Sequence, residues 1–280
     1  MRDFTLDTYG HLISALVETG YSFCTFEEFM AGQQSRVVML RHDVDRHSQR
    51  ALVMAVMEHE RKIKASYHIR VTAGRGIHAE ISVLEKIIEM GHEIAYHYED
   101  LSRALNKTGH SRFSRISQED FRSGIEMAKE SFRHNLDLLR QYYPVRVISM
   151  HGDPLSPHDN RRLWDYVNYA DFGIICEPYL DIDYDRVFYF TDTGRRWDAS
   201  NANRRDRVLQ NSDTRGIRLK RSTCDFHSTF DLIRSVSSWE MPDRIVINTH
   251  PQRWNNDIVP WLKELVGQNV KNVIKSALFR

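Results

Sequence analysis

Two aspartates with one residue between them follow an apolar run early in the chain. The run from Val37 to Leu40 has the composition of a buried strand, and side-chain alternation along a strand sends Asp43 and Asp45 to the same side. Two carboxylates this close raise each other's pKa unless a cation or hydrogen-bond donors lie between them. The spacing therefore fits a divalent metal site, with one carboxylate as ligand and the other as base, and it equally fits a capped turn.

Histidines stand at the ends of later apolar runs. His97 closes the segment that starts at Gly91, and Glu99 and Asp100 follow it closely. Imidazole and carboxylate groups together suit zinc, iron or manganese. His92 lies five residues before His97 and would point to the opposite face of the strand, so we expect a structural role for it.

His151 follows the apolar run from Val145 to Met150. It is a candidate metal ligand or oxyanion-stabilising donor, and Gly152 after it would let a substrate approach the backbone closely. A turn that leads into the next helix explains both residues equally well.

His250 follows the apolar run from Ile245 to Asn248. A single histidine there suits general acid catalysis, because its ordinary pKa of about 6.5 is close to neutrality. Upstream, Asp192 could orient this histidine. Trp197 could stack on a sugar ring, or it could belong to the core.

The elements that must position these residues alternate between strands and helices, a pattern typical of a parallel sheet wrapped by helices. The expected strands are 37–40, 65–71, 93–96, 145–150, 172–176, 187–190 and 245–248, and the expected helices are 6–17, 48–62, 79–90, 119–140, 159–169, 226–238 and 259–277. Because the carboxyl ends of parallel strands share one edge, the polar groups should meet there. One of these groups, Tyr67 to Arg70, lies at the end of the second expected strand.

No linker or internal repeat divides the chain, so residues 1–280 are expected to form one domain. It would carry an N-terminal helical extension over about 1–36 and a basic insertion over about 191–221. The insertion has nine basic residues and little apolar periodicity. Its arginines, Arg195 among them, could bind a phosphate group of a substrate, or they could form a solvated surface loop.

Composition excludes several classes of protein. The 280 residues are 41% hydrophobic and 28% charged, which indicates a folded chain rather than a disordered one. The net charge of +1 gives no reason to expect nonspecific binding to nucleic acid. No apolar run approaches the roughly 20 residues of a membrane span, and Asp3 and Asp7 interrupt any signal peptide. Three separated cysteines are expected to stay reduced, so we expect a cytoplasmic protein.

Taken together, the motifs resemble those of the NodB-like polysaccharide deacetylases of carbohydrate esterase family 4, in a branch associated with bacterial surface-polysaccharide biosynthesis. The segments that carry the resemblance are His42-Asp43-Val44-Asp45, Gly91 to Leu101, His151 to Trp164 and Asn248 to Trp254, within roughly residues 37 to 254. The resemblance implies a deformed (β/α) barrel of about seven strands. It also implies hydrolysis of N- or O-acetyl groups with a divalent metal, most often zinc.

The same resemblance implies roles for the matching residues. Asp43 corresponds to the general base, and Asp45 and His97 correspond to metal ligands. His250 corresponds to the acid that protonates the leaving group, and Asp192 to Trp197 corresponds to the element that tunes this histidine.

Two positions depart from the family pattern. Leu101 stands where the family has a second metal-binding histidine, so the third ligand must come from elsewhere, and we assign Asp100, with Glu99 and His151 as alternatives. The stretch from His151 to Pro154 stands near where the family has an Arg-x-Pro segment. The substrate-binding residues are then expected to be His151, Gly152, Arg195, Trp197 and Arg70.

The sequence thus predicts a metal-dependent hydrolase that removes an acetyl group from an N- or O-acetylated sugar, with zinc as the metal. A cytoplasmic precursor of a surface polysaccharide is the expected substrate, and no nucleic-acid partner is expected. Two alternatives stay open. One is a metal-dependent glycosyltransferase that uses the Asp43-Val44-Asp45 motif, and the other is a deacetylase-like binding protein without activity.

Overall fold

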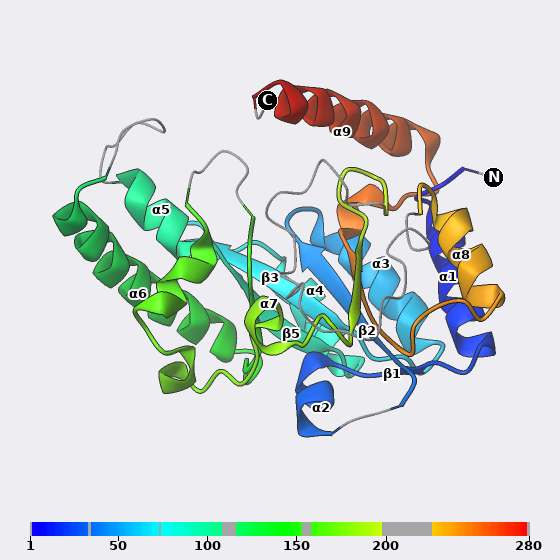
Figure 1. Ribbon diagram of the computed structural model, residues 1–280, viewed down its shortest axis with the longest axis horizontal. Coiled ribbons are helices and arrows are strands. Elements are labelled where there is room, and N and C mark those ends of the chain that lie inside the picture. The colour runs from blue at the N-terminus through cyan, green and yellow to red at the C-terminus, as the bar shows by residue number, and fades with distance from the viewer. Residues whose placement is uncertain are drawn as a thin grey trace.

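The structure is a computed structural model, and it describes residues 2–32, 35–72, 74–107, 116–152, 158–197 and 226–278, with side chains described up to residue 271. A parallel β-sheet runs through its middle, and helices pack around it (Figure 1). The spatial order of the main strands is β6 (Ile148–Met150), β5 (Glu93–Tyr98), β3 (Ser66–Thr72), β2 (Val37–Val44), β8 (Arg244–Thr249) and β7 (Phe188–Thr191). A short β1 (Ser22–Phe23) pairs with β2, and β4 (Gly76–Ile77) pairs antiparallel with β3. The fold class is therefore α/β, as the sequence predicts.

Several helices begin at a residue whose side chain caps the helix. The helices are α1 (Leu6–Glu18), α2 (Phe26–Ala31), α3 (Ser48–His59), α4 (Ile81–Glu89), α5 (Asp100–Lys107), α6 (Gln118–Arg140), α7 (Pro178–Asp181), α8 (Thr229–Ser237) and α9 (Ile258–Leu278), with short 3-10 turns at Asn160–Asp165, Tyr169–Phe172 and Pro251–Arg253. Thr25 with Glu28, and Ser228 with Asp231, form reciprocal capping boxes at the starts of α2 and α8.

Strand β2 is buried on both faces, and alternation gives its two faces different roles. Val38 and Leu40 point into the large core between the sheet and the helices. Val37 and Met39 point the other way, into a smaller core inside the curled sheet. The inner face is apolar at the start of the strand and becomes charged towards its carboxyl end.

The sheet is strongly curled. Strands β5 and β3 lie between β6 and β2, and neighbouring strands are about 4.8 Å apart, so a flat sheet would hold β6 and β2 about 14 Å apart. Side chains stand roughly perpendicular to a sheet. Nε2 of His151, after β6, nevertheless lies 3.5 Å from Oδ1 of Asp45, after β2. The curl therefore gathers residues from distant strands at one point on the inner side.

Two elements expected after β6 differ from the sequence prediction, and one helix was not expected. The prediction of a strand at 172–176 is wrong. A 3-10 turn ends at Phe172, Gly173 adopts a φ of +70°, and Cys176 alone forms a bridge, to Val147. The helix expected at 159–169 is a 3-10 turn over Asn160–Asp165. Helix α5, which starts at Asp100, was not predicted.

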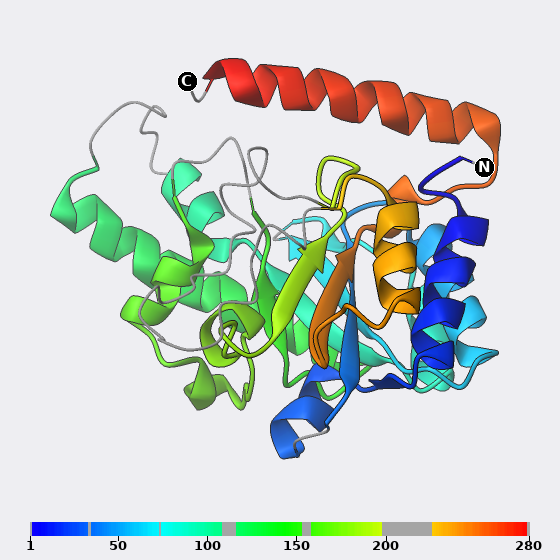
Figure 2. The same cartoon turned by 45° about the vertical axis from the view of Figure 1, so that its right-hand side comes forward.

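The first 36 residues contribute to the main body. Helix α1 packs beside α8, as Figure 2 shows, and β1 joins the sheet. Most of the expected basic insertion, from residue 198 to 221, lies outside the described residues. Within the described part of the chain, no helix combines the length and apolar character needed to cross a bilayer.

Candidate active site

Asp43 on β2 is held by hydrogen bonds to both of its oxygens. Arg41 donates from Nε to Oδ1 (2.7 Å) and from Nη2 to Oδ2 (3.0 Å), and Asn248 on β8 donates from Nδ2 to Oδ2 (3.0 Å). Arg41 is 0% and Asp43 is 3% exposed. Burial raises the pKa of Asp43, but the Arg41 guanidinium and nearby histidines lower it more, to well below its usual value. The carboxylate therefore stays ionised.

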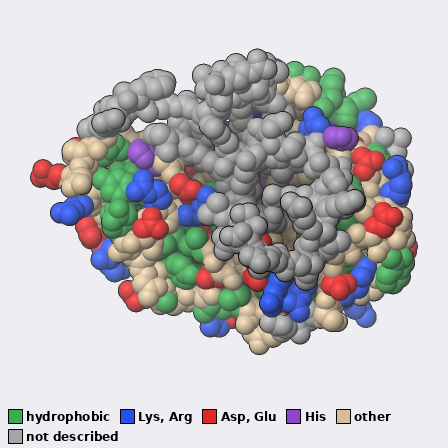
Figure 3. All heavy atoms as spheres, in the orientation of Figure 1, with side chains coloured by type: hydrophobic (Ala, Val, Ile, Leu, Met, Phe, Trp, Pro, Cys, Tyr) green, Lys and Arg blue, Asp and Glu red, His purple; other side chains and the backbone are tan. Residues whose placement is uncertain are grey.

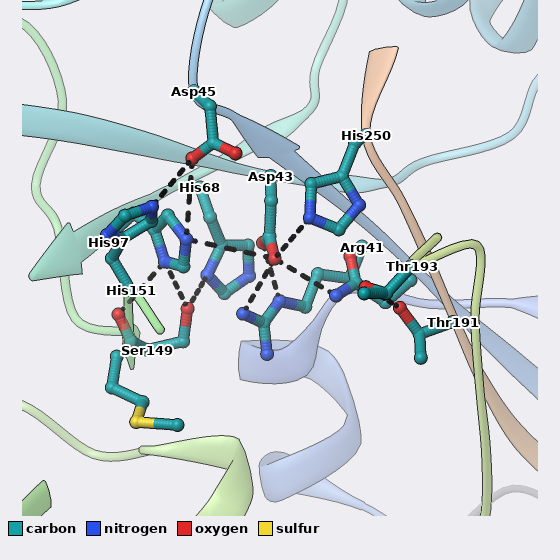
Figure 4. A network of polar contacts seen from close by, with 12 residues as sticks. Arg41, Asp43, Asp45, His68, His97, Ser149, His151, Thr191, Thr193 and His250 are labelled. Atoms are coloured by element: carbon teal, nitrogen blue, oxygen red, sulfur yellow. Dashed lines mark hydrogen bonds and ion pairs between the residues drawn. The ribbon is translucent and has the colours of Figure 1, made fainter. Parts of the chain in front are cut away.

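Three atoms of metal-ligand type converge beside Asp43. Oδ1 of Asp45 lies 3.8 Å from Nε2 of His97 and 3.5 Å from Nε2 of His151 (Figure 4). A tetrahedral zinc ion with bonds of about 2.0–2.2 Å separates its ligand atoms by about 3.3–3.6 Å. Oδ1 of Asp45 is buried and has no hydrogen-bond partner among the described residues. One carboxylate and two imidazoles at this spacing fit zinc or a similar divalent ion.

His97 is held in the tautomer that a metal ligand needs. Its Nδ1 lies 3.1 Å from both the carbonyl oxygen and the Oγ of Ser149. A ring nitrogen that faces a carbonyl oxygen carries the proton, which leaves the lone pair on Nε2. Burial lowers the pKa of His97 to about 4. The imidazole is therefore neutral near pH 7 and can bind a metal.

His151 lies within ion-pair distance of Glu99, which follows β5. Nδ1 of His151 lies 3.1 Å from Oε2 of Glu99, while its Nε2 faces Asp45. Arg70 and Arg103 donate to the same carboxylate, at 2.8 Å and 2.5 Å. Burial opposes ionisation of Glu99, but His151 and these cations hold its pKa far below the usual value. A carboxylate on the outer nitrogen fixes the tautomer and direction of a ligating histidine.

A second group of ligand-type atoms, formed by Asp43, His68 and His97, is fully buried. Nδ1 of His68 lies 2.7 Å from Oγ of Ser149, and burial holds the pKa of His68 well below its usual value. The permanent charge of Arg41 sits 2.7 Å from Asp43 and would repel a cation placed there. The group around Asp45 is therefore the better candidate metal site.

His250 approaches Asp43 from the opposite side. Its Nε2 lies 3.9 Å from Oδ2 of Asp43, and its Nδ1 lies 2.7 Å from Oδ1 of Asp192. Arg253 and Trp254 also donate to Asp192, at 2.5 Å and 2.9 Å. Burial and Arg253 lower the pKa of His250, but the Asp192 and Asp43 carboxylates raise it more, to above its usual value. The ring is thus fixed at Nδ1 and free to exchange a proton at Nε2.

The structure brings together Asp43, Asp45, His97, Asp192 and His250, but it places the assigned third ligand elsewhere. The Asp100 carboxylate accepts hydrogen bonds from Tyr96 (2.6 Å), Ser131 (2.6 Å) and Asn135 (2.9 Å), and it belongs to neither group of ligand-type atoms. Burial raises its pKa to about 6. Asp100 starts helix α5, which turns it away from the inner face.

His151 therefore replaces Asp100 as the third candidate ligand, and this also changes its own assignment from substrate contact to metal ligand. Leu101, where the sequence resemblance would place a second histidine, is 0% exposed in the core. The candidate third imidazole therefore lies just after β6 and not in the segment that follows β5.

Two residues assigned to substrate binding lie in the core. The Trp197 indole donates to Oγ1 of Thr229 (3.0 Å) and stacks on Phe4, and Trp197 is 2% exposed. The Arg195 guanidinium lies over the rings of Phe4 and Trp261, at 4.8 Å and 5.0 Å. Both side chains support the segment that carries Asp192 and do not face the candidate metal group.

The other two residues assigned to substrate binding, Arg70 and Gly152, lie close to the candidate metal group. Arg70 is paired with Glu99 and so acts on His151. Gly152 is half-buried directly after His151, and residues 153 to 157 lie outside the described residues.

Sequence reasoning missed the residues that orient the site. Arg41 lies two positions before Asp43 on the same face, so strand alternation alone could have revealed it. Ser149 and Asn248 also lie at strand ends, two residues before His151 and His250. No sequence pattern distinguishes Ser149 and Asn248 from ordinary strand residues.

No protein-family model and no curated protein matches this sequence. Among solved structures, a mutant of the peptidoglycan deacetylase PdaC from Bacillus subtilis is similar, with 11% sequence identity and a TM-score of 0.33. The similarity covers 87% of this chain and 98% of that chain. Similarity at this level assigns neither a family nor an activity to this chain.

Proposed function

We propose that this protein is a metal-dependent hydrolase that removes an acetyl group from an N- or O-acetylated sugar. The observation that carries the proposal is the position of Asp43 between two groups. Its Oδ2 is 3.8 Å from His97, a member of the candidate metal group, and 3.9 Å from His250, which is held by Asp192. A base, a metal group and an acid at these distances suit attack by water on an acyl carbon.

A divalent ion held by Asp45, His97 and His151 would supply Lewis-acid chemistry towards the acyl carbonyl oxygen. Asp43, kept ionised by Arg41, would accept the proton of the attacking water. His250, whose pKa is raised mainly by Asp192 against the effect of burial, would donate a proton from Nε2 to the departing nitrogen or oxygen.

The arrangement favours hydrolysis over both alternatives that the sequence leaves open. A glycosyltransferase that uses the Asp43-Val44-Asp45 motif has no role for His97 or His250, although both approach Asp43 within 4 Å. An inactive binding protein was favoured by Leu101, but His151 supplies an imidazole in its place.

A sugar carrying a phosphate or diphosphate, handled in the cytoplasm, is our proposed substrate. The proposal is supported by the motif resemblance and by the basic residues in the sequence between 195 and 221. Zinc is the proposed metal, because one carboxylate and two imidazoles form a common zinc donor set.

Acetate release tests the proposal directly. The zinc-supplemented protein should release acetate from N-acetylglucosamine or its nucleoside-diphosphate conjugate, with preference for the conjugate. His250→Ala should reduce turnover by about a hundredfold or more, as expected for loss of a general acid. His59→Ala, an exposed histidine on α3, is the matched control and should keep full activity. Sugar transfer without acetate release would contradict the proposal.

A further inference from the structure

Three arginines gather where β3 ends, beside the candidate metal group, and together they form what we call the arginine cluster. Side-chain alternation along β3 sends Ile69 to the large core and Arg70 to the inner face. Arg70 is in register with His97 on β5, so the two side chains lie on neighbouring strands of the same face. The other two members are Arg75, in the turn between β3 and β4, and Arg103, on α5.

A single acid, Glu99, lies among these arginines. Its Oε2 accepts a hydrogen bond from Arg70 (2.8 Å) and lies 3.1 Å from Nδ1 of His151. Its Oε1 accepts hydrogen bonds from Arg103 (2.5 Å) and Thr72 (3.3 Å). Both oxygens of Glu99 are therefore in use, and this one carboxylate can neutralise only one of the surrounding charges.

His78, half-buried after β4, responds to the charge that remains. Burial lowers its pKa, and so do the positive charges of Arg70, Arg103 and Arg75. The negative charge of Glu99 raises the pKa of His78 only in part, and the net shift is downward. The arginine cluster thus exceeds its acid by two positive charges.

Several donors of the arginine cluster have no partner. Nε of Arg70 is buried and has no hydrogen-bond partner among the described residues. The side chain of Arg103 uses Nε to reach Glu99 and is still 38% exposed. Arg75 is exposed and forms no ion pair within the described part of the chain. Buried polar donors are ordinarily satisfied, so these groups are placed to receive an anion.

This excess of positive charge is local. The net charge of the whole chain is only +1. Figure 3 shows acidic and basic side chains interspersed over the described part of one face of the molecule. Three arginines with one acid therefore differ from the ordinary surface of this protein.

We propose that the arginine cluster binds a phosphate group of the substrate, beside the acyl group that the reaction removes. The inference names the substrate of the proposed hydrolysis and rests on that function. Guanidinium groups bind phosphate oxygens through paired hydrogen bonds. A phosphate monoester carries about −1.5 to −2 charges near pH 7, which balances an excess of two, whereas a carboxylate carries only one.

The position of the arginine cluster indicates where the phosphate is attached. Arg70 and His97 are neighbours across the sheet, so an anion at Arg70 lies next to a group bound at the candidate metal site. In a 2-acetamido sugar 1-phosphate, the acetamide and the phosphate are attached to neighbouring ring carbons. We therefore assign the phosphate to the anomeric carbon of the sugar.

Binding of N-acetylglucosamine 1-phosphate tests the proposal. Calorimetry uses the full-length protein after treatment with a chelator, so that no metal ion can hold the phosphate. The 1-phosphate should bind at least tenfold more tightly than N-acetylglucosamine, and inorganic phosphate should compete with it. Arg75→Gln combined with Arg103→Gln should weaken binding of the 1-phosphate at least tenfold, because two charged donors are lost.

The matched control is Arg186→Gln combined with Arg234→Gln, since both arginines are exposed, at 74% and 75%. This variant should bind the 1-phosphate as the parent protein does. The proposal is overturned if the parent protein binds the 1-phosphate no more tightly than the free sugar, or if the variant of the arginine cluster binds it unchanged. Tighter binding of N-acetylmuramic acid, which has a carboxylate and no phosphate, would also overturn it.

Failure of this proposal can be distinguished from failure of the proposed hydrolysis, because binding is measured without turnover. Selective binding of the 1-phosphate with no acetate release refutes the reaction and supports the phosphate site. Acetate release from N-acetylglucosamine, with no preference for the 1-phosphate in binding, supports the reaction and refutes the phosphate site.

Discussion

At the scale of single residues, Asp43 and Asp45 share a strand end but have different surroundings. Asp43 accepts three hydrogen bonds from Arg41 and Asn248. Oδ1 of Asp45 accepts none among the described residues and faces two imidazoles. A carboxylate whose oxygens already accept hydrogen bonds is held in place and suits a base. A carboxylate oxygen that accepts none suits a metal ligand.

This difference predicts separate effects on metal content. Asp45→Ala should lose the metal, whereas Asp43→Asn should keep it and lose turnover by about a hundredfold or more. Because Arg41 then loses its buried partner, Asp43→Asn should also be less stable by about 3–5 kcal/mol. Metal analysis of the folded fraction from gel filtration checks the prediction. Asp100→Asn serves as the control and should retain the metal, and equal metal loss in all three variants would contradict the assigned roles.

The contact between Glu99 and His151 predicts a graded effect on the metal. Glu99→Gln removes the negative charge that lies beside Nδ1 of His151. The affinity for zinc should therefore fall about 10–100-fold, and the protein should still fold. Competition with a chromophoric chelator measures this change. Glu85→Gln, an exposed glutamate on α4, is the comparison. Unchanged zinc affinity in Glu99→Gln would show that Glu99 does not position His151.

At the scale of elements, β2 is anchored from its outer face by a buried carboxylate. Glu58 on α3 lies 2.8 Å from Nε2 of His42, and it accepts hydrogen bonds from Tyr67 (2.8 Å) and Tyr9. The other ring nitrogen of His42 lies 2.7 Å from Oγ1 of Thr249 on β8. These contacts join α1, α3, β2, β3 and β8 directly behind the candidate site.

Loss of this anchor should destabilise the whole fold. Glu58→Ala removes the partner of Nε2 of His42 and of the buried Tyr67 and Tyr9 hydroxyls, so the free energy of unfolding should fall by about 3–5 kcal/mol. Denaturant titration measures the change. Glu60→Ala, which truncates an exposed glutamate just after α3, should change stability by less than about 0.5 kcal/mol. Similar losses in the two variants would refute the anchoring role.

At the scale of the whole molecule, a buried acid far from the candidate active site should make stability depend on pH. Burial raises the pKa of Glu93, at the start of β5, from 4.5 to about 7. A carboxyl group whose pKa is raised by folding stabilises the fold only while it is protonated. This contribution is therefore complete below about pH 4.5 and is lost as the pH rises through 7.

Glu93→Gln removes that titration. The variant's stability relative to the parent protein should improve between pH 4.5 and 8, by at most about 3 kcal/mol at roughly 1.4 kcal/mol per pKa unit. Denaturant titrations of both proteins across this range provide the test. A difference in unfolding free energy that stays constant with pH would rule out the proposed role of Glu93.

The alternation of side chains along the strands explains which parts of the site could be predicted. Asp43, Asp45, His97 and His250 each follow a short apolar run, and the alternation of strand residues predicts their common face. The weak elements near β6 were misread, because a 3-10 turn and a lone bridge have no periodic signal.

By itself the sequence determined the α/β class, the main strands and the reactive residues at their carboxyl ends, because hydrophobic periodicity and strand alternation are local properties. Only the tertiary structure decided that His151 rather than Asp100 faces Asp45, and that Trp197 lies in the core. Those outcomes depend on how far the sheet curls and where α5 begins. Both follow from packing between segments that are distant in the chain, which no local pattern records.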